Sequence, residues 1–125
     1  MLDHASIGVR DLEKSGKFYD AALGALGYER LSNDEGSLGY GDKAVGFWLY
    51  ASEHPVPRDK RSGLHFCFKA SSHQLVGKFH AAALENGGDD NGKPGLRKDY
   101  GPHYYAAYVI DPDGYRLEAY CDKAS

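Results

Sequence analysis

The first half of the chain predicts one helix among four strands. Loosely alternating polar and apolar residues at positions 2–9 predict the first strand. Asp11 can cap the helix that follows, and Gly27 can end it. The apolar residues of this helix recur at helical spacing: Leu12, Phe18, Ala22, Leu23 and Leu26. Three further strands are expected at residues 28–31, 37–41 and 45–50, because turn residues separate these short apolar runs.

The second half follows the same order after a polar connector at residues 52–62. A strand is expected at residues 64–68, and the next helix should close at Gly87 and Gly88. The Gly- and Lys-containing stretch at residues 91–102 is expected to be a loop. Two further strands, at residues 104–110 and 115–121, flank a turn at residues 111–114. Because the second half repeats the order of the first, each half is read as a βαβββ unit.

Identical residues recur in the two halves at a single offset of 61 positions. The matches are His4 with His65, residues 16–18 with 77–79, residues 21–23 with 82–84, and Gly27 with Gly88. Two copies of a unit that cannot bury its own sheet face must pack together. We therefore expect one domain at residues 1–125, with module one at about 1–51, a linker at about 52–62 and module two at about 63–122. The concave surface between modules is a natural place for a small-molecule site.

Composition narrows the possible partners. The net charge is -3 and no basic stripe is present, which argues against nucleic acid. No apolar run approaches the roughly 20 residues of a membrane span. The first residues lack a charged start followed by an apolar stretch, so no signal peptide is predicted. Cys67 and Cys121 have no CxxC spacing and are expected to be free thiols, which together suggest a cytoplasmic protein.

Three segments carry a resemblance to a known family: the early-strand segments 2–9 and 63–68, each with its His, and the segment DPDGYRLEAY at 111–120. In these segments the chain resembles the vicinal oxygen chelate superfamily. That superfamily includes glyoxalase I, extradiol dioxygenases, fosfomycin-resistance enzymes and bleomycin-resistance proteins. The resemblance implies an α+β fold in which two tandem βαβββ modules form curved half-barrel sheets around a cleft. It also implies a divalent metal ion in that cleft and pairing into homodimers.

The resemblance also implies which residues would bind the metal. The family has one ligand position on the first strand and one on the last strand of each module. These positions correspond to His4, His65 and Glu118, while Trp48 occupies the fourth and cannot ligate through its N–H. Two His and one carboxylate suit Fe(II) in oxygenases, and Zn²⁺ accepts three ligands plus water. The metal could therefore be Zn, Fe(II), Mn or Ni. Glyoxalase I activity is not expected, because that enzyme uses four protein ligands.

These residues could instead have a structural role without binding metal. Strand His residues are commonly packed and hydrogen-bonded, and a duplication would copy the first His into the second module. Strand parity nevertheless places His4 and His65 on the less apolar face of their strands.

Two candidate catalytic residues lie near the predicted metal. A type I turn with a Gly bulge at residues 112–114 would place Tyr108 across from Glu118. Tyr108 also resembles the active-site tyrosine that precedes the Glu ligand of extradiol enzymes by ten residues. His103 could act as an acid or base. Either residue could instead have a structural or solvated role. The cations of residues 91–98 could close over an anionic substrate or simply be solvated.

Two functions fit the sequence. The first is a divalent-metal-dependent enzyme of the dioxygenase, lyase or thioltransferase type that acts on a small oxygenated molecule. The second is a metal-free protein of the bleomycin-resistance type that sequesters a small molecule. The aromatic residues that could line its cleft are Trp48, Tyr104, Tyr105, Tyr108 and Tyr120. A homodimer is expected in either case, with the paired modules coming from one chain or from two.

Overall fold

The first four-stranded sheet is formed by residues 5–51. A computed structural model describes all 125 residues of the chain, Met1–Ser125. The elements are β1 (Ala5–Val9), α1 (Leu12–Ala25), β2 (Glu29–Asn33), β3 (Ser37–Gly41) and β4 (Val45–Ala51). The strand order is β1-β4-β3-β2, with β1 parallel to β4 and the other pairs antiparallel. As predicted, Asp11 caps α1, and its carboxylate accepts a hydrogen bond from the Lys14 amide at 3.0 Å.

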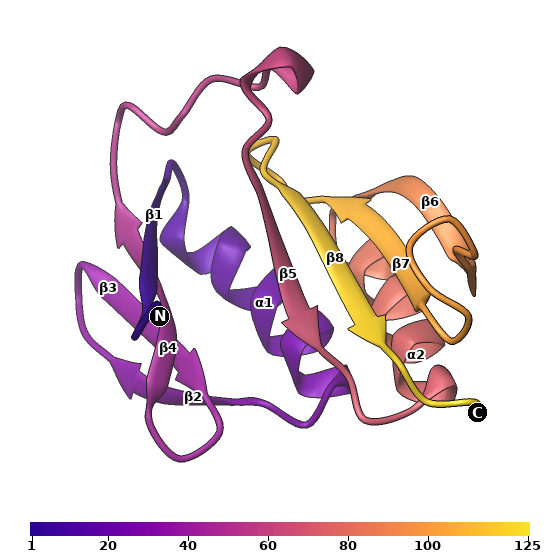
Figure 1. Cartoon of the computed structure of the whole chain (residues 1–125). Coiled ribbons are helices and arrows are strands. Elements are labelled where there is room, and N and C mark those ends of the chain that lie inside the picture. Colours follow the sequence, from indigo (N-terminus) through magenta and orange to yellow (C-terminus); the bar gives the residue numbers. More distant parts are fainter.

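The second sheet repeats this arrangement. Its elements are β5 (His65–Lys69), α2 (His73–Glu85), β6 (Asp89–Leu96), β7 (Tyr105–Ile110) and β8 (Arg116–Cys121). The strand order is β5-β8-β7-β6, and β5 is parallel to β8. A short 3₁₀ turn, η1 (Lys60–Ser62), lies in the connector between the sheets. Figure 1 shows the two sheets side by side with the connector crossing above them. The predicted α+β fold of two βαβββ modules is therefore confirmed.

Strand register makes the two modules equivalent residue by residue. Ser6 pairs with Trp48 in the first sheet, and Cys67 pairs with Glu118 in the second. Trp48 and Glu118 are thus counterparts. His65 is the first residue of β5, and His4 directly precedes β1. The offset of 61 residues found in the sequence therefore holds in three dimensions.

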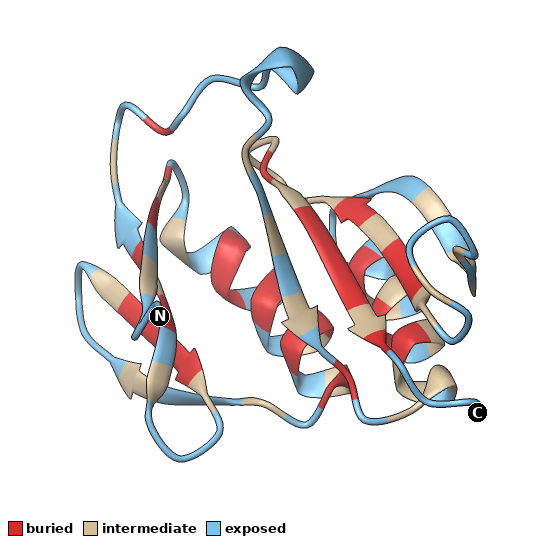
Figure 2. Ribbon diagram, viewed as in Figure 1, coloured by how far each residue is buried: buried red, intermediate tan, exposed pale blue.

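One apolar core joins the modules. It contains 21 buried residues from both sheets and both helices, and α1 contacts α2. The Phe47 ring of β4 packs against Phe66 and Phe68 of β5 at centroid distances of 5.4 and 5.2 Å. Each fully buried side chain of this size contributes roughly 1.5–3 kcal/mol. Figure 2 shows the buried positions along the helices and the inner strands, whereas β6 and the connector are mostly exposed. Neither helix has the length and apolar character that crossing a membrane requires.

The turn between β7 and β8 also ties the modules together. Asp111 is buried and accepts a hydrogen bond from the Tyr19 hydroxyl of α1 at 2.6 Å. The Gly114 amide donates to the Asp111 carbonyl at 3.0 Å, and Gly114 has a φ of 101°, which favours glycine. The Tyr115 hydroxyl donates to the Gly8 carbonyl at 2.8 Å. The predicted turn geometry is confirmed, and it fixes how β8 pairs with β7.

The prediction of a loop at residues 91–102 is wrong for residues 91–96. Residues 89–96 form the edge strand β6, which pairs antiparallel with β7. The register shifts between Asp90 and Gly92 and again between Gly92 and Gly95. Gly92 has a φ of 153° and lies against the Tyr108 ring. These irregularities and Pro94 remove the polar–apolar alternation by which a strand is recognised in sequence.

Candidate functional site

A buried carboxylate marks the candidate site. Glu118 is 3% exposed, and its Oε1 lies 2.7 Å from Nε2 of His65 on the neighbouring strand. The alternation of β8 explains the position, because Leu117 and Ala119 enter the core while Glu118 faces the other side of the sheet. A buried charge is stable only when other groups compensate it. The His65–Glu118 pair predicted from the sequence is therefore brought together by the fold.

A tyrosine that the sequence reasoning did not single out as catalytic holds the second carboxylate oxygen. The Tyr104 hydroxyl donates to Oε2 of Glu118 at 2.6 Å. Its ring stacks on Tyr120 with centroids 4.1 Å apart. Tyr104 precedes β7 by one residue and has the same parity as Tyr108, so the alternation of the strand could have identified it. The two contacts orient the Glu118 carboxylate from both sides.

Tyr108 lies directly across from Glu118 in the β7–β8 register, as predicted. Burial, and then the Glu118 carboxylate, raise the pKa of Tyr108 to about 12. The same two causes hold the pKa of Tyr104 well above its usual range. The Arg97 guanidinium lies over the Tyr108 ring, 5.3 Å from its centroid. Both phenols therefore stay protonated near neutral pH and can act as hydrogen-bond donors.

Cys67 lies beside Glu118 in the β5–β8 register. The residue reaches solvent, but partial burial of its thiol and then the Glu118 carboxylate raise the pKa of Cys67 to about 12. A protonated thiol is a poor nucleophile. We therefore assign Cys67 no catalytic role.

His4 does not reach the His65–Glu118 pair within one chain. Its side chain is 51% exposed, and its Nδ1 lies 2.7 Å from Oδ1 of Asp3. His4 and His65 line one cleft of about 700 Å³ between the modules, but Glu118 does not line it. No group of three or more His, Cys, Asp or Glu side chains is arranged to hold a metal ion in the single chain. The expected convergence of three ligands is therefore absent within one chain.

Neither His103 nor Trp48 forms a hydrogen bond with the pair. His103 is exposed in the turn before β7, and its ring forms no hydrogen bond with another residue. Trp48 lies on β4 between Ser6 and Gly39, where a Cβ on Gly39 would come within 2.9 Å of the indole. Its ring stacks on Tyr50 at 6.0 Å. Module one thus offers an aromatic ring where module two offers a carboxylate.

Comparisons with known proteins agree with the fold of two paired modules. The chain resembles a glyoxalase/bleomycin resistance protein from Albidiferax ferrireducens, with 35% identity and a TM-score of 0.81 over 96% of this chain and 97% of that one. A putative glyoxalase from Bacillus halodurans is 31% identical, with a TM-score of 0.69 over 96% and 94% of the two chains. The fosfomycin resistance protein FosX from Listeria monocytogenes is 16% identical, with a TM-score of 0.70 over 96% and 91%, and shares the fold.

A family profile covers nearly the whole chain. The profile of the Glyoxalase/Bleomycin resistance protein/Dioxygenase superfamily matches residues 1–119, which include both modules and the His65–Glu118 pair. The resemblance found in the sequence is thereby confirmed. On the profile match, the paired βαβββ modules and the two relatives above 30% identity, this chain belongs to the Glyoxalase/Bleomycin resistance protein/Dioxygenase superfamily.

Proposed function

We propose that the protein is a divalent-metal-dependent enzyme that acts on a small oxygenated molecule, with His65 and Glu118 as two of its metal ligands. The observation that carries this proposal is the buried Glu118 carboxylate, 2.7 Å from Nε2 of His65. An apolar residue would stabilise this position without the cost of burying a charge. The presence of the pair is more readily explained by binding than by folding.

The donor set fits a divalent cation. An imidazole nitrogen and a carboxylate oxygen suit Zn, Fe(II), Mn or Ni. The two atoms already meet, so a cation could replace the proton that they share. Tyr104 holds the other carboxylate oxygen and would orient the ligand, as outer hydrogen-bond partners do in metal sites.

A bound divalent cation would supply Lewis acidity toward adjacent oxygens of a substrate. The chain's own contribution would be hydrogen bonding and positioning. Tyr108 faces the same side of the sheet as Glu118 and keeps its proton at neutral pH. Its hydroxyl could donate to an oxygen that gains negative charge during the reaction. We assign His103 no step, because it lies in an exposed turn.

We infer that a second copy of the chain supplies His4 as the third ligand. Strand β1 pairs only with β4, and β5 pairs only with β8, so both strands leave a free edge. Unpaired edges favour association with another chain. If module one of one copy lies beside module two of the other, His4 can approach the His65–Glu118 pair of that other copy. The incomplete ligand set of the single chain supports this homodimer.

A second candidate function is metal-free sequestration of a planar ligand. The stacked pair Tyr104–Tyr120 and the pair Trp48–Tyr50 provide aromatic surfaces that could hold such a ligand. Sequestration would not need the Glu118 carboxylate. The two functions therefore predict different effects of removing that carboxylate. The metal-dependent enzyme should lose its metal, whereas the sequestering protein should still bind its ligand.

Metal analysis tests the proposal directly. Protein purified without chelators should contain a divalent metal, and Glu118→Ala should lower the affinity for zinc by at least about 100-fold, since loss of an outer partner alone costs 10–100-fold. The matched control is Glu53→Ala, which removes an exposed carboxylate with no hydrogen-bond partner in the chain. Unchanged zinc affinity in Glu118→Ala would contradict the metal site and favour the sequestration function.

A further inference from the structure

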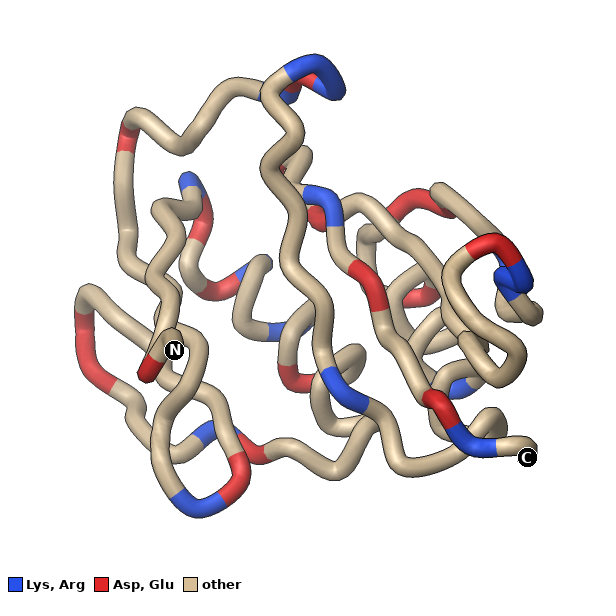
Figure 3. Tube along the Cα trace, viewed as in Figure 1, with Lys and Arg blue, Asp and Glu red and all other residues tan.

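Two cations that form no ion pair with a carboxylate lie beside His65. Lys60 of η1 and Arg116 of β8 line a recess of about 340 Å³ together with His65 and Tyr108. Arg116 precedes Glu118 by two residues, so both face the same side of the sheet. Neither cation forms an ion pair with a carboxylate, whereas nearby Arg61 pairs with Asp59 at 3.1 Å. Figure 3 shows basic segments in the connector and at the start of β8, next to an acidic segment further along β8.

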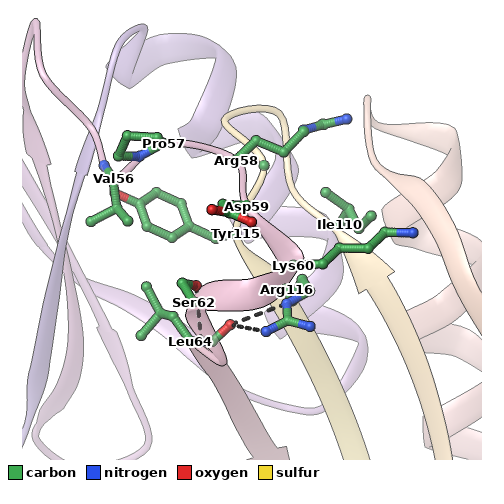
Figure 4. Close-up of a pocket in the computed structure, with 11 residues that line it drawn as sticks. Val56, Pro57, Arg58, Asp59, Lys60, Ser62, Leu64, Ile110, Tyr115 and Arg116 are labelled. Atoms are coloured by element: carbon green, nitrogen blue, oxygen red, sulfur yellow. Dashed lines mark hydrogen bonds between the residues drawn. The ribbon is translucent and has the colours of Figure 1, made fainter.

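The Arg116 guanidinium is fixed in position. Its Nε and Nη2 both donate to the Leu64 carbonyl, at 3.2 and 3.1 Å. These bonds use one edge of the guanidinium and leave Nη1 without a partner in the chain. Figure 4 shows both bonds and the Lys60 side chain extending beside Arg116. A guanidinium held in this way is suited to bind an anion, because little entropy is lost when it does so.

A second, smaller recess of about 90 Å³ is lined by the same two cations. The connector, the turn before β8 and the start of β8 form its walls (Figure 4). Arg58 also lines it but lies 3.8 Å from a carboxylate oxygen of Asp89. Asp59 lines this smaller recess as well, although its carboxylate pairs with Arg61. The larger recess, which has no carboxylate in its lining, is therefore where Lys60 and Arg116 can meet an anionic group.

We propose that the substrate carries an anionic group, a carboxylate or a phosphate-like group, which Lys60 and Arg116 bind beside the metal site. Lys60 and Arg116 determine where the anion would bind. The inference that this anion is part of the substrate rests on the proposed function of His65 and Glu118. Arg97, over the Tyr108 ring, adds positive charge on the same face. A neutral substrate would leave the two cations unpaired.

Inorganic phosphate tests the anion site without relying on the metal. Calorimetric titration of the metal-free protein at constant ionic strength should show phosphate binding, and Lys60→Met should weaken it about 10-fold, the loss typical of one charged hydrogen bond. Lys60 forms no side-chain hydrogen bond or ion pair, so the variant should fold normally. Lys43→Met, in the β3–β4 turn, removes the same charge elsewhere and should bind like wild type. No phosphate binding, or equal binding by Lys60→Met and wild type, would overturn the anion site.

A pair of catechols tests whether the anion belongs to the substrate. Catechol and 3,4-dihydroxybenzoate share adjacent oxygens and differ by one carboxylate. The zinc-loaded protein should bind the carboxylate compound about 10-fold more tightly, and Lys60→Met should remove that preference. Equal affinity of wild type for the two compounds would overturn the substrate assignment. If the metal site fails instead, phosphate binding by the metal-free protein remains sensitive to Lys60→Met.

Discussion

Single residues at equivalent positions give the two modules different chemistry. Glu118 on β8 is buried and bonded to His65 and Tyr104, whereas its counterpart Trp48 on β4 stacks on Tyr50. Gly39 leaves the space that the indole occupies. Module one therefore lacks a carboxylate at the position equivalent to Glu118. The carboxylate of the proposed site comes from module two alone.

The first prediction is that the protein is not an efficient glyoxalase I. With Trp48 in place of a second carboxylate, Glu118 would have to serve as both ligand and base. Losing one positioned acid or base typically costs about 10²–10⁴-fold in rate. The assay uses metal-loaded protein and the hemithioacetal of methylglyoxal and glutathione. Turnover of about 1–10³ per second would show that another group replaces the missing carboxylate.

The sequence predicted part of the site at this scale. The repeat identified His65, and the turn at residues 111–114 correctly placed Tyr108 across from Glu118. Tyr104 was expected only as an aromatic ring lining the cleft, although its shared parity with Tyr108 could have placed its hydroxyl near Glu118. Lys60 was missed because a connector carries no periodicity that could place it. The shared cleft of His4 and His65 was foreseeable, but the separation of His4 from Glu118 depends on how the modules pack.

At the scale of elements, the turn between β7 and β8 has a titratable centre. Burial raises the pKa of Asp111 to about 6, although hydrogen bonds from Tyr19 and from the backbone amides of Tyr115 and Asp113 oppose the shift. The unfolded value is about 3.9. Protonated Asp111 therefore contributes stability that is fully present below about pH 4 and is lost as the pH rises through about 6.

The second prediction concerns this turn. Asp111→Asn cannot ionise but keeps an oxygen for the backbone amides. The free energy of unfolding of wild type, measured relative to Asp111→Asn in urea, should fall by about 2 kcal/mol between pH 4 and pH 7. Asp34→Asn, at an exposed site before the β2–β3 turn, is the control and should show no such change. A difference between wild type and Asp111→Asn that does not vary with pH would contradict the raised pKa.

Most elements were predictable because their local signals agree with the packing. Asp11 caps α1 as predicted, and seven of the strands were expected close to their observed positions. β6 was missed because its bulges at Gly92 and Gly95 hide the alternation. Its pairing with β7 comes from the sheet, and no local preference of residues 89–96 reveals it.

At the scale of the whole molecule, the free edges of β1 and β5 predict a homodimer. Sedimentation equilibrium should give twice the mass of one chain at micromolar concentration. A variant that tests the β1 edge must leave the buried side chains of this strand unchanged, because replacing Ile7, for example, would disturb the core. Ser6→Pro removes an amide donor on β1 and should weaken association. A monomer at high protein concentration would contradict the dimer and leave His4 without a route to the metal site.

The proposed sharing of a metal site between two chains has a direct test in mixed dimers. We expect His4→Ala and Glu118→Ala dimers each to bind little zinc. A heterodimer of one His4→Ala chain and one Glu118→Ala chain, purified through two different tags, keeps one intact combination of ligands if each site draws on both chains. It should bind zinc at half the wild-type stoichiometry with wild-type affinity. A heterodimer that binds no zinc would contradict the shared site, and single variants that bind zinc like wild type would contradict the ligand assignment itself.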